Sequence, residues 1–121
     1  MNHLMLKKHL RMNFYQKNKE GKFIIMANSL VSIQIIPKLE NSSESYSYVD
    51  AAIAVIQEAG VKYQVNPLET TMEGELSELL EIVQLMNEKM ISMGAINVIS
   101  QVKIVYQPDG IKGETLTEKY R

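Results

Sequence analysis

Cysteine is absent from this sequence and histidine is scarce. Without cysteine there are no disulfides, no thiolate metal sites and no cysteine nucleophiles. The two histidines, His3 and His9, lie near the N-terminus, so we expect neither a multi-histidine metal centre nor a cofactor. No stretch approaches the ~18 consecutive apolar residues of a membrane span, and we expect a soluble, cytoplasmic protein. With 121 residues, 45% of them hydrophobic, the chain suits one domain with one core.

Charge divides the chain into two parts. Residues 1–25 carry six lysines and arginines against one glutamate, a net charge of +5, whereas residues 26–121 carry seven against thirteen acidic residues, a net charge of −6. A basic arm can bind nucleic acid or a membrane surface, and its apolar spacing permits a short amphipathic helix. It has neither the apolar core nor the cleavage site of a signal peptide. Because Met26 leads directly into a strand, we expect residues 1–25 to be a disordered extension or a misannotated start.

The hydrophobic period then switches between two and 3.6 residues. Residues 30–36 alternate between apolar and polar side chains, which predicts a half-buried strand that ends at Pro37. Residues 46–59 place apolar side chains on one helical stripe, and Gly60 supplies a C-terminal cap. The apolar face of this strand is Val31, Ile33 and Ile35, and the stripe of the helix is Val49, Ala52, Ile53 and Ile56.

Residues 61–106 are predicted to form two strands, a helix and a last strand. Residues 61–65 and 68–74 alternate again, and the turn signal Asn66-Pro67 joins them. Residues 75–93 form the longest helical pattern, and residues 96–106 form a last strand. The stripe of the second helix is Leu76, Leu79, Leu80, Val83, Met86 and Met90.

The order strand, helix, strand, strand, helix, strand is that of the ferredoxin-like fold. We therefore predict an α+β domain over 26–107, βαββαβ, whose four-stranded antiparallel sheet carries two helices on one face, and a polar C-terminal tail over 108–121. A two-layer domain of this size buries a limited core, so association through the uncovered face or the edge strands would add stability. The uncovered face is predicted to carry Ser32, Gln34, Lys62, Gln64, Glu69, Thr71, Glu73, Ile99, Gln101, Lys103 and Val105.

The block VKYQVNPLETTMEGE, residues 61–75, combines the end of a glycine-capped helix, a proline turn and a strand ending in Thr-Thr-x-Glu-Gly. With SIQIIP, residues 32–37, it resembles the YkoF-like thiamine-binding protein family, small ferredoxin-like domains that assemble as homotetramers. The resemblance covers about residues 28–106. It implies recognition of thiamine (vitamin B1) or its hydroxymethylpyrimidine part, no catalysed reaction, and a role in thiamine handling or transport. The basic N-terminus and the tail after Gly110 lie outside the family pattern.

Thiamine carries a permanent thiazolium charge beside a hydrogen-bonding aminopyrimidine, so its site needs a carboxylate or an aromatic face together with amide or hydroxyl groups. Glu73 or Glu69 could neutralise the cation, and one of Tyr46, Tyr48 and Tyr63 could stack on a ring. Each also has an ordinary structural explanation as a solvated strand end, a β-former or a core residue. The predicted ligand-binding residues are Gln34, Tyr48, Thr70, Thr71 and Glu73.

Catalytic residues are not expected. Glu73 and Glu75 at a strand-to-helix junction do not define a general acid and base, and no histidine follows Met26. The sequence has no phosphate-cradling glycine loop and no metal-ligand spacing. The methionines of the apolar stripes are explained by core packing.

A second class of function stays open, a ligand-free protein interaction or regulatory module that uses the surface of the oligomer. RNA binding is disfavoured because the predicted open face offers only Lys62 and Lys103 as cations and the domain is acidic. The predicted partners are therefore a small cationic, thiamine-like ligand and other copies of the chain in a homotetramer, without nucleic acid or a membrane span.

Overall fold

The computed structural model describes residues 15–17, 23–25, 27–41 and 44–121. Within the predicted N-terminal extension, β1 (Tyr15–Lys17) pairs antiparallel with β2 (Phe23–Ile25). The remainder of that extension, including the residues of the suggested amphipathic helix before Tyr15, lies outside the described residues.

The main sheet contains four antiparallel strands in the order β4-β5-β3-β6. The central strand β3 (Ser29–Lys38) pairs along its whole length with the edge strand β6 (Asn97–Tyr106). On its other side β3 pairs with β5 (Thr70–Gly74), which in turn pairs with the short edge strand β4 (Lys62–Val65). The prediction of a four-stranded antiparallel sheet is confirmed.

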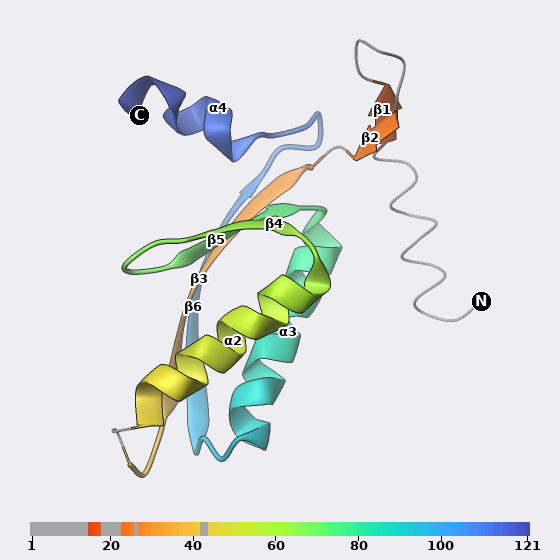
Figure 1. The fold of residues 1–121 in the computed structure, drawn as a ribbon. Coiled ribbons are helices and arrows are strands. Elements are labelled where there is room, and N and C mark those ends of the chain that lie inside the picture. Colours follow the sequence, from red (N-terminus) through yellow and green to blue (C-terminus); the bar gives the residue numbers. More distant parts are fainter. Residues whose placement is uncertain (1–14, 18–22, 26, 42–43) are drawn as a thin grey trace, which may run out of the picture.

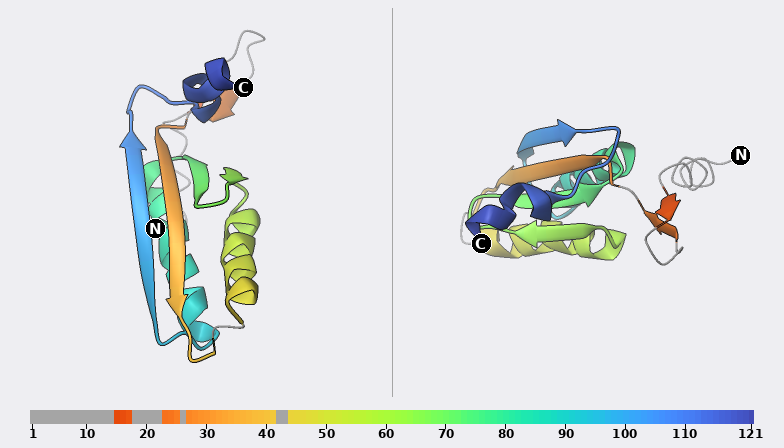
Figure 2. Two further views of the ribbon diagram at one scale, coloured as in Figure 1. Left: turned by 90° about the vertical axis from the view of Figure 1, so that its left-hand side faces the viewer. Right: turned by 90° about the horizontal axis from the view of Figure 1, so that it is seen from above.

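Two helices, α2 (Ser45–Ala59) and α3 (Leu76–Ser92), lie side by side on one face of this sheet (Figures 1 and 2). The α+β ferredoxin-like architecture predicted from the sequence is therefore confirmed. At the end of α2, Gly60 takes a positive φ of 76°, the left-handed conformation that a C-terminal cap requires and that glycine adopts without strain.

The hydrophobic core fills the space between the helices and the inner face of the sheet. Alternation along β3 turns Val31 and Ile33 inward, and both are almost fully buried. In α3 the predicted stripe is wrong at Leu80, which is 42% exposed, whereas Ile82 is buried. The reason is geometric, because the spacing 79, 82, 86, 90 follows one face at 3.6 residues per turn and position 80 lies about 100° away. The buried core residues of the helices are Tyr48, Ala52, Ile56, Leu79, Ile82, Met86 and Met90.

A buried asparagine joins three elements at one end of the sheet. The side-chain oxygen of Asn28 accepts hydrogen bonds from the Leu76 backbone N–H at 3.0 Å and from the Ser29 hydroxyl at 2.9 Å. Its backbone N–H donates to the Gly74 carbonyl, and its carbonyl accepts from the Gln107 N–H. Asn28 therefore fixes the start of β3 against the start of α3 and the end of β6.

The C-terminal segment is folded, although the sequence analysis predicted only a polar tail. After β6 the chain turns, and Ile111 is buried with its N–H donating to the Ala27 carbonyl at 2.9 Å. The short helix α4 (Gly113–Thr117) and a 3-10 turn, η2 (Glu118–Tyr120), follow. Figure 1 shows this segment beyond the end of the sheet where β6 ends and β3 begins. Here it contacts residues of the face that α2 and α3 leave uncovered.

Among the described residues, no helix has both the length and the hydropathy that crossing a bilayer requires. That part of the chain also holds no group of three or more acidic or histidine side chains placed to bind a metal ion.

Candidate ligand-binding site

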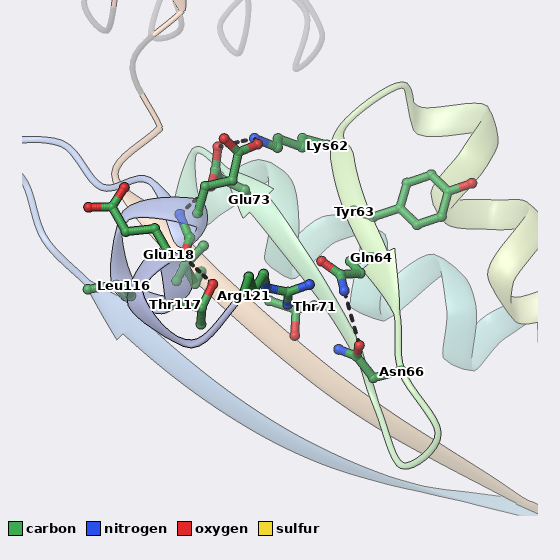
Figure 3. Close-up of a pocket in the computed structure, with 13 residues that line it drawn as sticks. Lys62, Tyr63, Gln64, Asn66, Thr71, Glu73, Leu116, Thr117, Glu118 and Arg121 are labelled. Carbon is green, nitrogen blue, oxygen red and sulfur yellow. Dashed lines mark hydrogen bonds and ion pairs between the residues drawn. The ribbon is translucent and has the colours of Figure 1, made fainter.

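A pocket lies between the uncovered face of the sheet and the C-terminal segment (Figure 3). Its volume is about 470 Å³, within the range of ~300–1,000 Å³ that small-molecule sites occupy. Strands β3, β4 and β5 supply one wall, and α4 with η2 supplies the other. The sheet contributes Leu30, Lys62, Gln64, Thr71 and Glu73, and the C-terminal segment contributes Gly113, Glu114, Leu116, Thr117, Glu118 and Arg121.

Strand register explains why these sheet residues meet. Glu73 of β5 is paired with Lys62 of β4 on one side and Leu30 of β3 on the other. Two residues along β5, Thr71 is paired in the same way with Gln64 of β4. Because residues i and i+2 of a strand share a face, these two cross-strand rows project from the same side of the sheet.

Glu73 is the most enclosed carboxylate of the pocket, with its side chain 16% exposed. Its Oε1 accepts a hydrogen bond from the Gly113 backbone N–H at 2.7 Å, which ties the start of α4 to β5. Its Oε2 lies 3.9 Å from the Lys62 ammonium. Because an ionised carboxylate has about four acceptor positions, Glu73 retains capacity for a donor or cation inside the pocket.

Lys62 joins β4 to α4. Its ammonium donates a hydrogen bond to the Glu114 carboxylate. This contact raises the pKa of Lys62 above the ordinary lysine value, with a further contribution from the charge of Glu73. The same hydrogen bond lowers the pKa of Glu114. Both groups therefore stay charged across the neutral range.

Arg121 carries the second positive charge of the pocket. Among the described residues, its guanidinium has no hydrogen bond or ion pair, and only its backbone N–H is bonded, to the Glu118 carbonyl. In Figure 3 its side chain lies between the C-terminal segment and β5, where Thr71 is placed.

The structure brings together two of the five predicted ligand residues. Thr71 and Glu73 both line the pocket. Gln34 lies on the same face of the sheet but is exposed farther along β3 and does not line the pocket. Whether any of the five binds a ligand stays a prediction.

The other two predicted residues, Thr70 and Tyr48, lie on the opposite side of the sheet. Thr70 is 7% exposed and paired with the inward-facing Ile33, because alternation turns it away from Thr71. Tyr48 is buried in the core, and its hydroxyl donates to the Met93 carbonyl. Tyr48, Ala52 and Ile56 are spaced four residues apart and share one face of α2. This spacing could have predicted from the sequence that Tyr48 lies in the core.

None of the three tyrosines suggested to stack on a ligand, Tyr46, Tyr48 and Tyr63, places its ring beside Glu73 and Thr71. Tyr63 belongs to the lining, but Figure 3 shows its ring directed away from Glu73 and Thr71, and it packs against the core. Tyr46 is exposed at the start of α2 and does not contribute to the lining.

Sequence reasoning missed the wall made by the C-terminal segment. Glu114, Glu118 and Arg121 belong to a stretch without a long hydrophobic period, and the buried Ile111 is a single apolar residue that marks its return to the sheet. Lys62 was placed on the uncovered face but was not considered as a site residue.

Comparison with known proteins covers the chain from within β3 to its last residue. A family model described as thiamine-binding protein matches residues 31–121. A UPF0045 protein of Clostridium perfringens is 47% identical over 91 residues, which cover 75% of this chain and 95% of the relative. The expectation that the tail after Gly110 lies outside the family pattern is wrong, because the matched region includes it.

Among the solved structures that share the fold, two are described as follows. One is a domain of unknown function, DUF77, from Bacillus cereus, with 37% identity and a TM-score of 0.73 over 78% of this chain and 92% of that one. The other is a Thermotoga maritima protein proposed to act in thiamine biosynthesis or salvage, with 33% identity and a TM-score of 0.71 over 78% of this chain and 99% of that one.

Proposed function

The chain belongs to the thiamine-binding protein family, and from this premise we propose that the pocket between the sheet and α4 binds thiamine or its hydroxymethylpyrimidine part. We propose further that binding involves no catalysed reaction and serves thiamine handling or transport. The membership in the family and the likeness to a protein proposed to act in thiamine biosynthesis or salvage support a thiamine-related binding role.

One observation carries the proposal. The partly enclosed Glu73 carboxylate lines the same pocket as the Thr71 hydroxyl and the Gln64 amide. Glu73 would face the thiazolium cation, since a carboxylate with little solvent attracts a cation more strongly than one in bulk water. The Thr71 hydroxyl and the Gln64 amide would bond the nitrogen-bearing edge of the aminopyrimidine. Lys62 forms a long ion pair with Glu73 at 3.9 Å, beyond hydrogen-bond distance, and donates its hydrogen bond to Glu114. Glu73 therefore keeps acceptor positions for a second cation.

The change Glu73→Gln tests this role. Glutamine keeps an oxygen that can accept from the Gly113 N–H but removes the charge that would attract thiamine. We expect thiamine affinity to fall by about tenfold or more, measured by calorimetric titration, because a charge-assisted contact is worth ~1.5–3 kcal/mol.

The matched control is Glu69→Gln. Glu69 bonds the Ser32 hydroxyl and lies 3.8 Å from the Lys103 ammonium on the same face, but it does not line the pocket. Its substitution should leave thiamine affinity unchanged. Equal affinity of the wild-type and Glu73→Gln proteins would remove Glu73 from the site.

Thermal unfolding separates this proposal from the alternative of a ligand-free interaction module. A ligand at 100 times its dissociation constant should stabilise the protein by ~2.7 kcal/mol. We expect thiamine or hydroxymethylpyrimidine to raise the melting temperature. No shift with either compound at millimolar concentration would favour the interaction module.

We also propose that the chain self-associates, as a homotetramer, through the uncovered face away from the pocket. Ile36 and Ile99 are paired across β3 and β6 there, and both are exposed in the single chain. Apolar side chains on an exposed sheet face, next to an edge strand that pairs on one side only within the described residues, favour a second copy as the partner. The expected cytoplasmic location stays a prediction.

A further inference from the structure

The pocket contains charges of both signs at different depths. Glu73 lies at the enclosed end, whereas Arg121 and Glu118 are exposed at the mouth. Of the two cations, Lys62 already has Glu114 and Glu73 as partners. The Arg121 guanidinium has none among the described residues. Within the part of the chain that the structure describes, the pocket therefore presents a positive group without a partner of its own.

An arginine guanidinium offers five N–H donors in a rigid planar fork, which matches the oxygens of a phosphate in a two-bond arrangement. The Thr71 hydroxyl belongs to the same lining and is a further donor for an oxyanion. The position at the mouth also suits a phosphate, because full burial of a doubly charged group would cost far more than partial burial. A cation alone would gain nothing from Arg121, since like charges repel.

From this arrangement we propose that the site selects a phosphorylated ligand, with the ring system at Glu73 and a phosphate ester at Arg121. The inference rests on the proposed function and narrows its ligand class to thiamine phosphates. Thiamine monophosphate is the simplest member, because it combines the thiazolium charge with one phosphate group.

Calorimetric titration of the full chain with thiamine and with thiamine monophosphate tests the proposal. We expect thiamine monophosphate to bind about tenfold or more tightly than thiamine, the factor that one charge-assisted contact supplies. The affinity for the phosphate ester should also fall more steeply with added salt, because exposed charges are screened.

The variant Arg121→Gln should lower the ratio of the two affinities by about tenfold. Arg121 is exposed, so the melting temperature without ligand should stay within about 1 °C of the wild type. The matched control is Lys119→Gln, which removes the same charge two residues away. Lys119 does not line the pocket, and its ammonium lies 5.0 Å from the centroid of the Tyr120 ring. This control should keep the wild-type ratio.

Three results would overturn the inference, and they distinguish its failure from that of the proposed function. Tight binding of thiamine with no preference for its monophosphate, or a preference that survives Arg121→Gln, would leave the proposed function intact and remove the phosphate subsite. Absence of binding for both compounds would remove the proposed function and the inference together.

Discussion

Asn28 shows how much a single polar residue decides in this fold. Its side-chain oxygen accepts from two donors, the Leu76 N–H at the first residue of α3 and the Ser29 hydroxyl, which is fully buried. Early helix N–H groups have no partner within the helix, so a side chain must provide one. The Glu75 carboxylate does the same for the next two N–H groups, those of Ser77 and Glu78.

We predict that Asn28→Ala destabilises the protein by about 1–3 kcal/mol, because the buried Ser29 hydroxyl and the partly buried Leu76 N–H both lose their acceptor. The melting temperature in a thermal unfolding scan should fall by at least about 4 °C. The exposed Asn97→Ala serves as the control and should change it by about 1 °C or less. A melting temperature unchanged in Asn28→Ala would mean that the interior supplies another acceptor.

The alternation of side chains along β5 separates two of the predicted ligand residues. Thr70 and Thr71 are neighbours in sequence, yet one lies in the core and the other in the pocket. Strand alternation alone would have made that distinction, so the selection of both was inconsistent with the predicted faces. For Arg121, by contrast, no pattern in the neighbouring sequence indicated that it would line the pocket.

Among the described helices, the short α4 depends most on contacts with the rest of the fold. A five-residue helix is far below the length at which a helix is stable alone in water. It is held instead by the buried Ile111, by the Glu73 carboxylate at the Gly113 N–H and by Lys62 at Glu114. The two side-chain contacts come from strands β5 and β4, 40 and 52 residues earlier in the sequence.

We predict that a chain ending at Lys112 stays folded but loses its response to ligand. The truncation keeps Ile111 and every strand of the sheet, and it removes residues that form one wall of the pocket. Its melting temperature without ligand should fall only a few degrees, and thiamine should no longer raise it. A full ligand-induced shift in the truncated chain would show that α4 takes no part in the site.

At the scale of the whole molecule, the two faces of the sheet differ in what covers them, and this difference decides where ligands and other copies can bind. Helices α2 and α3 cover one face, and α4 covers only the end of the other near β4 and β5. The β3–β6 half of that second face and the β6 edge stay uncovered within the described chain. The pocket and the proposed surface of self-association thus occupy different parts of one face.

We predict that Ile99→Lys weakens self-association. Ile99 is 57% exposed on β6, and a lysine there would place a charge where two sheets or two edges must approach. Analytical ultracentrifugation should show a shift from tetramer towards smaller species. The control Leu68→Lys changes a residue that is 78% exposed in the β4–β5 turn, and it should leave the distribution unchanged. A wild-type monomer at micromolar concentration would contradict the proposed tetramer.

The sequence by itself determined the four strands of the main sheet, the two long helices and most of their buried faces. Hydrophobic periods of two and 3.6 residues are local properties, so these elements and the shared face of Thr71 and Glu73 followed from pattern alone. Only the tertiary structure decided that the residues after Gly110 return to the sheet and close a pocket around Glu73. That return depends on contacts between residues distant in the chain, which no local period encodes, and it is what places Lys62 and Arg121 in the same site.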